Sequence, residues 1–207
     1  MTAFDIIYHF YPQDTPLRRL LLLHSQCVAE KALAILDHYV EVSAAYPVSS
    51  IETLKIDRQL VFDGAMLHDI GICRCDAPGI LCDGTEPYIC HGTIGAEMIR
   101  EYLSELKQEN VNLSAVNLEA CARICERHTG AGLTAQNIID QQLPILPVRD
   151  LLPETPEEKL VCLADKFFSK SGDPSIEKDF ARVKRSMQKF GADSEARFDA
   201  LCTLFYM

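Results

Sequence analysis

The sequence predicts an all-α fold, and three observations lead to this prediction. Apolar residues recur at spacings of three, four and seven in five separate segments, as they do along one face of a helix. Threonine or aspartate precedes several helical segments, twice with proline directly behind it, as at the start of many helices. Alternation with a period of two is nowhere long enough to indicate a strand.

The first half of the chain is expected to hold two helices and a loop. A long helix covers residues 16–45, with Thr15 at its N-cap, and the sequence "YPVSS" ends it. Asp57 can cap a second helix, which is expected to end at Gly71. Residues 74–90, "RCDAPGILCDGTEPYIC", contain two prolines and two glycines and therefore predict a loop.

Helices are also expected throughout the second half. The first two cover about 91–108 and 114–128, and the sequence "TGAG" stops the latter. A capping box follows at Thr155, since a glutamate lies three residues further on. The remaining helices are expected to start after Thr134, Thr155, Ser175 and Asp193.

Composition narrows the class of protein. The chain has 207 residues, 48% of them hydrophobic and 24% charged, which suits one soluble domain over residues 1–207. A net charge of −10 without a basic tract disfavours duplex nucleic acid as a partner. No apolar run is long enough to span a bilayer, and the N-terminus lacks the basic residues of a secretory signal. Nine cysteines without such a signal predict reduced thiols in the cytoplasm.

Polar residues occupy apolar helix faces at five places, and these residues are the candidate functional site. One buried histidine bonded to a carbonyl group would be ordinary. Four of the six histidines and two aspartates directed at one small core need a common explanation, because a buried carboxylate requires a partner. The residues are His24, His68, Asp69, His91, His128 and Asp165.

A shared divalent metal is the explanation that the residue types favour. Neutral imidazoles and carboxylates are the usual ligands of iron, manganese, nickel and zinc. Six ligands exceed the need of one tetrahedral ion, so two ions are expected. His68 and Asp69 differ by about 100° around the helix, and the two oxygens of Asp69 allow it to bridge both ions. Gly64 and Ala65, one turn earlier, are expected to leave room beside them.

Two histidines are expected to lie outside this site. His38 follows His24 by fourteen residues and therefore lies about 21 Å further along the same helix. It is interpreted as a packing or surface residue. His9 precedes the first predicted helix, and the sequence indicates no partner for it.

The ordered set of His24, His68-Asp69 within "HDIG" and Asp165 within "ADK" resembles the HD superfamily of metal-dependent phosphohydrolases. With the two later histidines, it is similar to the subset in which the pattern H…HD…H…H…D holds a binuclear centre. "HD" alone is a weak signal, whereas six ordered ligands, each on a helix, are a specific one.

Longer tracts support the resemblance. "HGTIGAEMIREY", "ERHTGAGLT" and "LPETPEEKLVCLADK" look closest to a group of largely uncharacterised HDIG-domain proteins. The resemblance implies a helical HD-domain core over about residues 17–172 with the metal site inside it. Residues 173–207 are then expected to form a C-terminal helical extension.

One position departs from the family pattern. Related proteins often carry lysine or arginine directly after the HDIG glycine, where this chain has Ile72. Arg74 and Lys166 are expected to replace that basic residue as phosphate contacts, and Arg127 is a further candidate. Each of these three has an equally good interpretation as a salt-bridge partner. With Asp69, the residues Arg74 and Lys166 complete the expected catalytic set.

The resemblance implies metal-assisted hydrolysis of a phosphate ester or anhydride. Two ions about 3.5–4 Å apart would make a bridging water more acidic and hold a phosphoryl oxygen. Iron or manganese is the expected metal, with nickel, zinc and magnesium as alternatives. The expected substrate is a small phosphorylated molecule, such as a nucleotide, and the loop over residues 74–90 is the candidate rim of its site.

Two other functions stay open at this stage. Some HD-fold proteins with the same six ligands are mixed-valent di-iron oxygenases, and the ligands alone do not separate the two chemistries. Others are non-catalytic sensors or scaffolds, although such members tend to lose ligands and this chain has lost none. The sequence leaves the substrate, the number of ions and the oligomeric state open.

Overall fold

The computed structural model of the protein describes residues 1–45, 54–109, 116–188 and 192–206. Its helices are α1 (Ala3–Phe10), α2 (Pro16–Ala45), α3 (Arg58–Leu67), α4 (His91–Gln108), α5 (Leu118–Arg127), α6 (Ala135–Asp140), α7 (Pro156–Asp165), α8 (Phe180–Gln188) and α9 (Ala192–Phe205). Short elements join α3 to α4, namely the 3₁₀ helices η1 (Ile70–Arg74), η2 (Pro78–Ile80) and η3 (Tyr88–Cys90) and the strands β1 (Cys75–Ala77), β2 (Cys82–Asp83) and β3 (Glu86–Pro87). The predicted all-α fold is confirmed.

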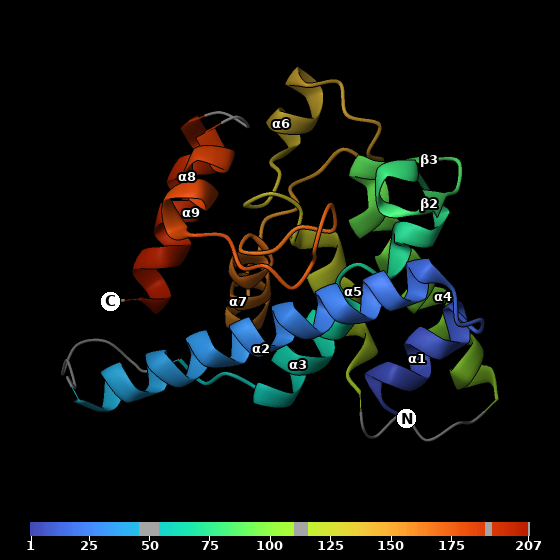
Figure 1. The fold of residues 1–207 in the computed structure, drawn as a ribbon, viewed down its shortest axis with the longest axis horizontal. Coiled ribbons are helices and arrows are strands. Elements are labelled where there is room, and N and C mark those ends of the chain that lie inside the picture. Colours follow the sequence, from blue (N-terminus) through green and yellow to red (C-terminus); the bar gives the residue numbers. More distant parts are fainter. Residues whose placement is uncertain (46–53, 110–115, 189–191, 207) are drawn as a thin grey trace.

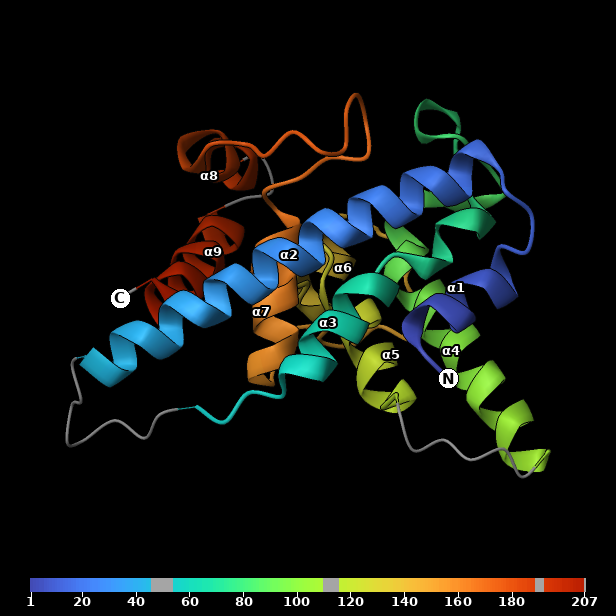
Figure 2. The ribbon, with the colours of Figure 1, turned by 60° about the horizontal axis from the view of Figure 1, so that its bottom comes forward.

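The long helix α2 is the axis on which the other helices are arranged. It crosses the molecule from one end to the other, and α3 and α7 pack along it (Figure 1). α5 packs against α3, α4 and α7, so that these helices enclose a common core. α1 and α4 lie toward the start of α2, whereas α8 and α9 lie toward its end (Figure 2). The two ends of the molecule are therefore connected by α2 and by the helices that pack along it, α3 and α7.

Three helices begin where their capping residues predicted them. Two others do not, since α8 begins at Phe180, five residues after Ser175, and α9 begins at Ala192, before Asp193. The carboxylate of Asp57 accepts hydrogen bonds from two backbone N–H groups in the first turn of α3. Thr155 and Glu158 form the predicted capping box at α7, and Thr134 caps α6 in the same way. Each cap satisfies backbone donors that have no partner within the helix. These starts could be predicted because each cap is local in sequence.

Two predicted boundaries fall outside the described residues. They are the "YPVSS" segment at 46–50 and the predicted start near 114 of the helix that ends at His128. Within the described part, α5 begins at Leu118 and is capped by the side chain of Asn117.

The structure corrects two expectations, one about the N-terminal segment and one about residues 74–90. The N-terminal segment forms α1, which was not predicted; Thr2 and Asp5 form a capping box there. Eight residues are too few to reveal a helical period. The segment 74–90 is also more ordered than the predicted loop, because β2, β1 and β3 form a small sheet in that order. Strands of two or three residues cannot show alternation.

The second predicted helix ends earlier than expected, and Gly71 has another role than ending it. α3 stops at Leu67, and Gly71 lies inside η1. A Cβ atom on Gly71 would come within 2.3 Å of the His91 carbonyl oxygen and 2.5 Å of the Gly95 amide nitrogen. Glycine is therefore required here because η1 packs directly against the first turns of α4. This close approach brings the start of α4 next to Asp69.

Gly64 also serves a different purpose from the predicted one. It was expected to leave room beside the ligands, but a Cβ atom there would lie 2.2 Å from Cδ1 of Ile124. The space above Gly64 is thus filled by a side chain of α5. The absence of a side chain lets α3 and α5 pack closely, which positions the residues at both helix ends.

We propose that residues 1–207 form one domain, as the sequence indicated. The extension packs against the helical core, since α9 contacts both α2 and α7. Its side chains Phe198 and Phe205 are fully buried in the main hydrophobic cluster. Within the described ranges, no helix is both long and apolar enough to cross a lipid bilayer.

Tyr11 connects α1 to the turn that follows Asp69. Its buried hydroxyl donates to the carbonyl oxygen of Ile70 at 2.6 Å and accepts from the backbone N–H of Cys73 at 3.2 Å. One side chain therefore holds both ends of η1.

We expect Tyr11→Phe to lower the free energy of unfolding by about 1–3 kcal/mol, because buried backbone groups lose the hydroxyl that bridges them. Urea denaturation followed by circular dichroism measures the change. Tyr8→Phe is the matched control, since Tyr8 is 47% exposed and should change stability by less than about 0.5 kcal/mol. Equal effects of the two substitutions would contradict the proposal that the Tyr11 hydroxyl holds η1.

Candidate metal centre

Six buried polar side chains converge where the ends of four helices meet the middle of α2. They are His24 of α2, His68 and Asp69 after α3, His91 at the start of α4, His128 after α5 and Asp165 at the end of α7. The structure thus brings together all six residues that the sequence predicted as ligands. Their ligand atoms form two groups, and within each group all atoms lie within 4.8 Å of one another.

Asp69 belongs to both groups, and its two oxygens face different neighbours. Oδ2 lies 3.2 Å from Nε2 of His24 and 3.0 Å from Nε2 of His68. Oδ1 lies 3.3 Å from Nε2 of His91 and 3.4 Å from Nε2 of His128. Asp165 completes the first group, with Oδ1 3.1 Å from Nε2 of His24. Asp69 is therefore shared by the two groups.

Hydrogen bonds to the backbone orient three of the histidines. In each, Nδ1 donates to the carbonyl oxygen three residues earlier: His68 to Ala65 at 2.6 Å, His91 to Tyr88 at 2.7 Å and His128 to Cys125 at 2.7 Å. A proton on Nδ1 leaves the lone pair on Nε2, which points into the cluster. Metal-binding histidines are commonly held in this way.

Several atoms of the cluster have no hydrogen-bond partner although they are buried. They include Nε2 of His68 and Oδ1 of Asp69, whereas Oδ2 of Asp69 has an ion-pair partner in the ammonium of Lys170 at 2.6 Å. Moreover, the Nε2 atoms of His91 and His128 face each other at 3.1 Å, and both are acceptors when Nδ1 carries the proton. Two acceptors cannot form a hydrogen bond with each other, so a cation between them is needed to offset the repulsion of their lone pairs. The donor set of imidazole nitrogen and carboxylate oxygen fits a divalent metal.

The electrostatic surroundings keep the carboxylates charged. Burial alone would raise the pKa of Asp69, but His68 and Lys170 hold that pKa well below its usual range. Lys166 and the neighbouring histidines likewise hold the pKa of Asp165 well below its usual range against the effect of burial. Burial lowers the pKa of His91 to about 3, which keeps this imidazole neutral. The cluster therefore offers anionic oxygens and a neutral His91. Asp69 and Asp165 outweigh burial and raise the pKa of His68 to about 9, so this imidazole must release a proton when it binds a metal.

Two lysines flank the cluster, and only one was predicted. The ammonium of Lys166 lies 2.7 Å from Oδ2 of Asp165 and donates to the carbonyl oxygen of His128 at 3.0 Å. Lys170 was missed, although its ammonium lies 2.6 Å from Oδ2 of Asp69 and its side chain is only 10% exposed. Lys170 follows α7 in an irregular segment, where helical periodicity gives no information about direction. Its spacing of five residues from Asp165 was the available signal.

The other basic candidates lie elsewhere. Arg74 is 49% exposed, lies near Glu101 and is not among the residues that line the cavity beside the cluster. Arg127 is occupied by the Leu152 carbonyl oxygen and by Glu154, each at 2.8 Å or less. Ile72 is fully buried in the hydrophobic core and is not among the residues that line the cavity. The geometry gives no support to Arg74 as a phosphate contact.

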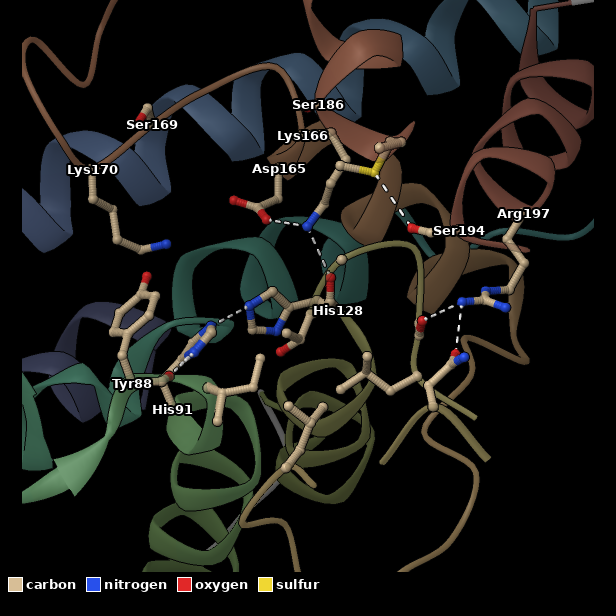
Figure 3. A pocket seen from close by; sticks show the side chains of 18 of the residues that line it. Tyr88, His91, His128, Asp165, Lys166, Ser169, Lys170, Ser186, Ser194 and Arg197 are labelled. Atoms are coloured by element: carbon tan, nitrogen blue, oxygen red, sulfur yellow. Dashed lines mark hydrogen bonds and ion pairs between the residues drawn. The ribbon is translucent and has the colours of Figure 1, made fainter. Parts of the chain in front are cut away.

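A cavity of about 600 Å³ opens beside the cluster. His91, His128 and Asp165 lie at its inner end, and Figure 3 shows Lys166 and Lys170 above the two histidines. Within the loop predicted as the rim, Tyr88 and Ile89 line the cavity. The far wall comes from α8 and α9, so the C-terminal extension helps to enclose the space next to the ligands.

The two remaining histidines lie outside the cluster. His38 is exposed on α2 and lies near the Tyr206 ring. His9 stacks on Tyr102, with ring centroids 4.3 Å apart. That partner lies on α4 and could not be named from local sequence.

The sequence profile of the HD domain matches residues 21–169, which is most of the chain and includes all six clustered residues. The chain therefore belongs to the HD-domain family. No solved structure shows a significant match to it.

Three relatives align with two thirds or more of this chain. An uncharacterised protein of Methanocaldococcus jannaschii is 35% identical over 143 residues, which cover 69% of this chain and 67% of that protein. A tRNA (cytidine(56)-2′-O)-methyltransferase of Picrophilus torridus is 34% identical over 141 residues, and that of Thermoplasma volcanium is 28% identical over 165. The matches cover 68% and 80% of this chain, but only 33% and 35% of those two enzymes.

We expect Asp69→Ala to abolish metal binding, because both ligand groups lose the carboxylate that they share. The variant should also lose the rise in melting temperature that Mn²⁺ gives to the unsubstituted protein. Elemental analysis and calorimetry measure the two effects. His38→Ala is the control and should leave metal content unchanged. Full metal content in Asp69→Ala would refute the site.

His91→Ala tests whether the two groups hold separate ions. It removes one donor from the second group and leaves the first group complete, so metal content should fall from about two ions per chain to about one. Titration with Mn²⁺ monitored by electron paramagnetic resonance gives the stoichiometry. A single ion in both the unsubstituted protein and the variant would show that His91 and His128 hold no metal.

Proposed function

We propose that this chain is a metal-dependent phosphohydrolase that acts on a small phosphorylated substrate. The observation that carries the proposal is the buried carboxylate of Asp69, which faces two groups of imidazole nitrogens. Members of both groups, namely Asp165 of the first and His91 and His128 of the second, line a cavity that also presents lysine side chains. Membership of the HD family supports the metal-dependent chemistry.

His24, His68 and Asp165 would hold one divalent ion, His91 and His128 would hold another, and Asp69 would contact both. Iron or manganese fits this mixture of nitrogen and oxygen donors best, with nickel, zinc and magnesium as alternatives. When bound, such ions polarise a phosphoryl oxygen and make a nearby water more acidic.

The chain's own residues hold the site in a fixed geometry. Lys166 ties Asp165 to the carbonyl oxygen of His128, so we assign it a positioning role. Tyr88 accepts a hydrogen bond from His91 through its backbone and stacks on that imidazole, with ring centroids 4.6 Å apart. Burial of the ligands excludes bulk water, which strengthens electrostatic interactions at the inner end of the cavity.

Lys170 is the residue that we expect to contact the phosphoryl group. Its ammonium lines the cavity and lies next to the carboxylate of Asp69. Neighbouring carboxylates outweigh burial and raise its pKa above the ordinary value, so the side chain stays charged. A positive charge at this point can neutralise the charge that develops on the phosphoryl oxygens. Lys170 thus takes the role that the sequence suggested for Arg74.

The names of the two methyltransferase relatives raise RNA as a partner. The chain spans only about a third of those enzymes, so their activity need not reside in the shared part. The net charge of −10 also disfavours a polyanionic partner. We therefore propose a small-molecule substrate and, because the nine cysteines are free thiols, a cytoplasmic location.

We expect Mn²⁺-loaded protein to release phosphate from a small phosphate ester under strict anaerobiosis. Lys170→Ala should lower kcat/KM by about 10–100-fold, because a charge that stabilises the phosphoryl group is lost. Arg74→Ala, which removes an exposed cation outside the cavity, should change it less than about twofold. A panel of nucleotides and sugar phosphates with a phosphate-release assay measures both.

The same assay in air separates hydrolysis from oxygen chemistry. If turnover requires O₂ and no ester releases phosphate, the protein is a di-iron oxygenase and the proposed hydrolase function is wrong. If Lys170→Ala and Arg74→Ala lower kcat/KM equally, Lys170 is not the specific phosphate contact. The proposed hydrolase activity would still stand.

A further inference from the structure

The wall of the cavity opposite the metal ligands contains one amide whose orientation is determined by its partners. Asn137 of α6 lines the cavity. Its Oδ1 accepts hydrogen bonds from the backbone N–H of Thr134 at 3.2 Å and from Nη2 of Arg197 at 3.1 Å. Both partners can only donate, so the atom that faces them must be oxygen. The amide nitrogen of Asn137 is thereby directed away from them.

Arg197 is held firmly enough to enforce this orientation. Its Nε donates to the carbonyl oxygen of Ala131 at 3.1 Å, and Nη2 donates to that of Gly132 at 3.1 Å. Figure 3 shows Arg197 on the far side of the cavity from Lys170 and His91, with two of its hydrogen bonds drawn as dashed lines. The guanidinium is thus committed to the protein and positions Asn137.

The surroundings of Asn137 suit the organic part of a substrate more than its phosphate. Leu133, Leu143 and Met187 supply apolar surface to the cavity, and Ser194 and Gln141 add uncharged polar groups. Sites for small molecules commonly combine such walls with a few fixed polar groups that determine specificity. A volume of about 600 Å³ is large enough for an organic group of nucleoside size beside the ligand cluster.

We propose that Asn137 determines specificity by donating a hydrogen bond from its amide nitrogen to an acceptor on the uncharged organic group of the substrate. The acceptor would be a carbonyl oxygen or a ring nitrogen, as on a nucleobase. This inference rests on the proposed hydrolase for the phosphate end, but the contact with the organic group needs neither metal nor hydrolysis. Arg197, the residue that orients Asn137, lies outside the HD match at 21–169, so specificity depends on the C-terminal extension.

Asn137→Asp is the decisive substitution. It preserves an oxygen for Thr134 and Arg197 and replaces only the donating –NH₂ by an acceptor, so the fold should be retained. For the best nucleoside monophosphate among AMP, GMP, CMP and UMP, KM should rise by about tenfold or more with kcat little changed. Phenyl phosphate, whose organic group carries no acceptor, should keep its kcat/KM.

Asn117→Asp is the matched control. Asn117 caps α5 through its side-chain oxygen, so this substitution makes the same chemical change outside the cavity and should leave both substrates unaffected. An unchanged KM for the monophosphate in Asn137→Asp would overturn the proposal, as would an equal rise for phenyl phosphate.

Calorimetric titration with adenosine, guanosine, cytidine and uridine distinguishes this proposal from the proposed function. Binding of one nucleoside that weakens about tenfold or more in Asn137→Asp supports the contact even where no ester is hydrolysed. If phosphate is released but no nucleoside binding or monophosphate KM responds to Asn137→Asp, the hydrolase stands and the role of Asn137 is refuted.

Discussion

A carboxylate buried in a cluster of imidazoles is the constraint on which the rest of this structure depends. Asp69 is fully buried, and its two oxygens face imidazoles from four helices. Such a group is costly to remove from water, so its neighbours must be placed where they can compensate its charge. The helix ends, the backbone bonds to the histidines and the flanking lysines all serve this placement.

Helix ends are suited to hold such a cluster. A ligand at the end of a helix can leave the helical path, which lets residues from several elements reach one point. His68, His128 and Asp165 all lie at C-terminal ends, whereas His91 starts α4. Close packing then sets the distances, since Gly71 allows η1 to approach α4 and Gly64 allows α3 to approach α5. Small residues at these crossings therefore determine the geometry of the cluster without contacting it.

The cavity joins two parts of the chain with different roles. The part that matches the HD family supplies the ligands, and the segment behind it supplies Lys170 and the far wall. Arg197 links these parts, because it holds the loop that follows His128 through the carbonyl oxygens of residues 131 and 132. The chemistry and the specificity of the site are thus carried by separate segments that must fold together.

The sequence by itself determined most of the helices and which six residues cluster in the core. Helical periodicity and capping are local, so Asp57 and Thr155 indicated where helices begin, and a polar residue on an apolar stripe indicated a direction toward the core. α1 and the three short strands were not predicted, because they are too short to show a period. The sequence shows that residues 64 and 71 are glycines, but it does not show which atoms pack against them.

Only the tertiary structure decided which basic residues face the cavity. Arg74 and Lys170 both lie within five residues of a clustered aspartate, yet Lys170 points to the cluster and Arg74 lies on the exposed surface. Both belong to segments that follow the helix carrying the ligand, where spacing does not set direction. Asn137 and Arg197, sixty residues apart, meet only because α6 and α9 fold against the same loop. Contacts between distant segments depend on how whole helices pack, and no local pattern in the sequence encodes that packing.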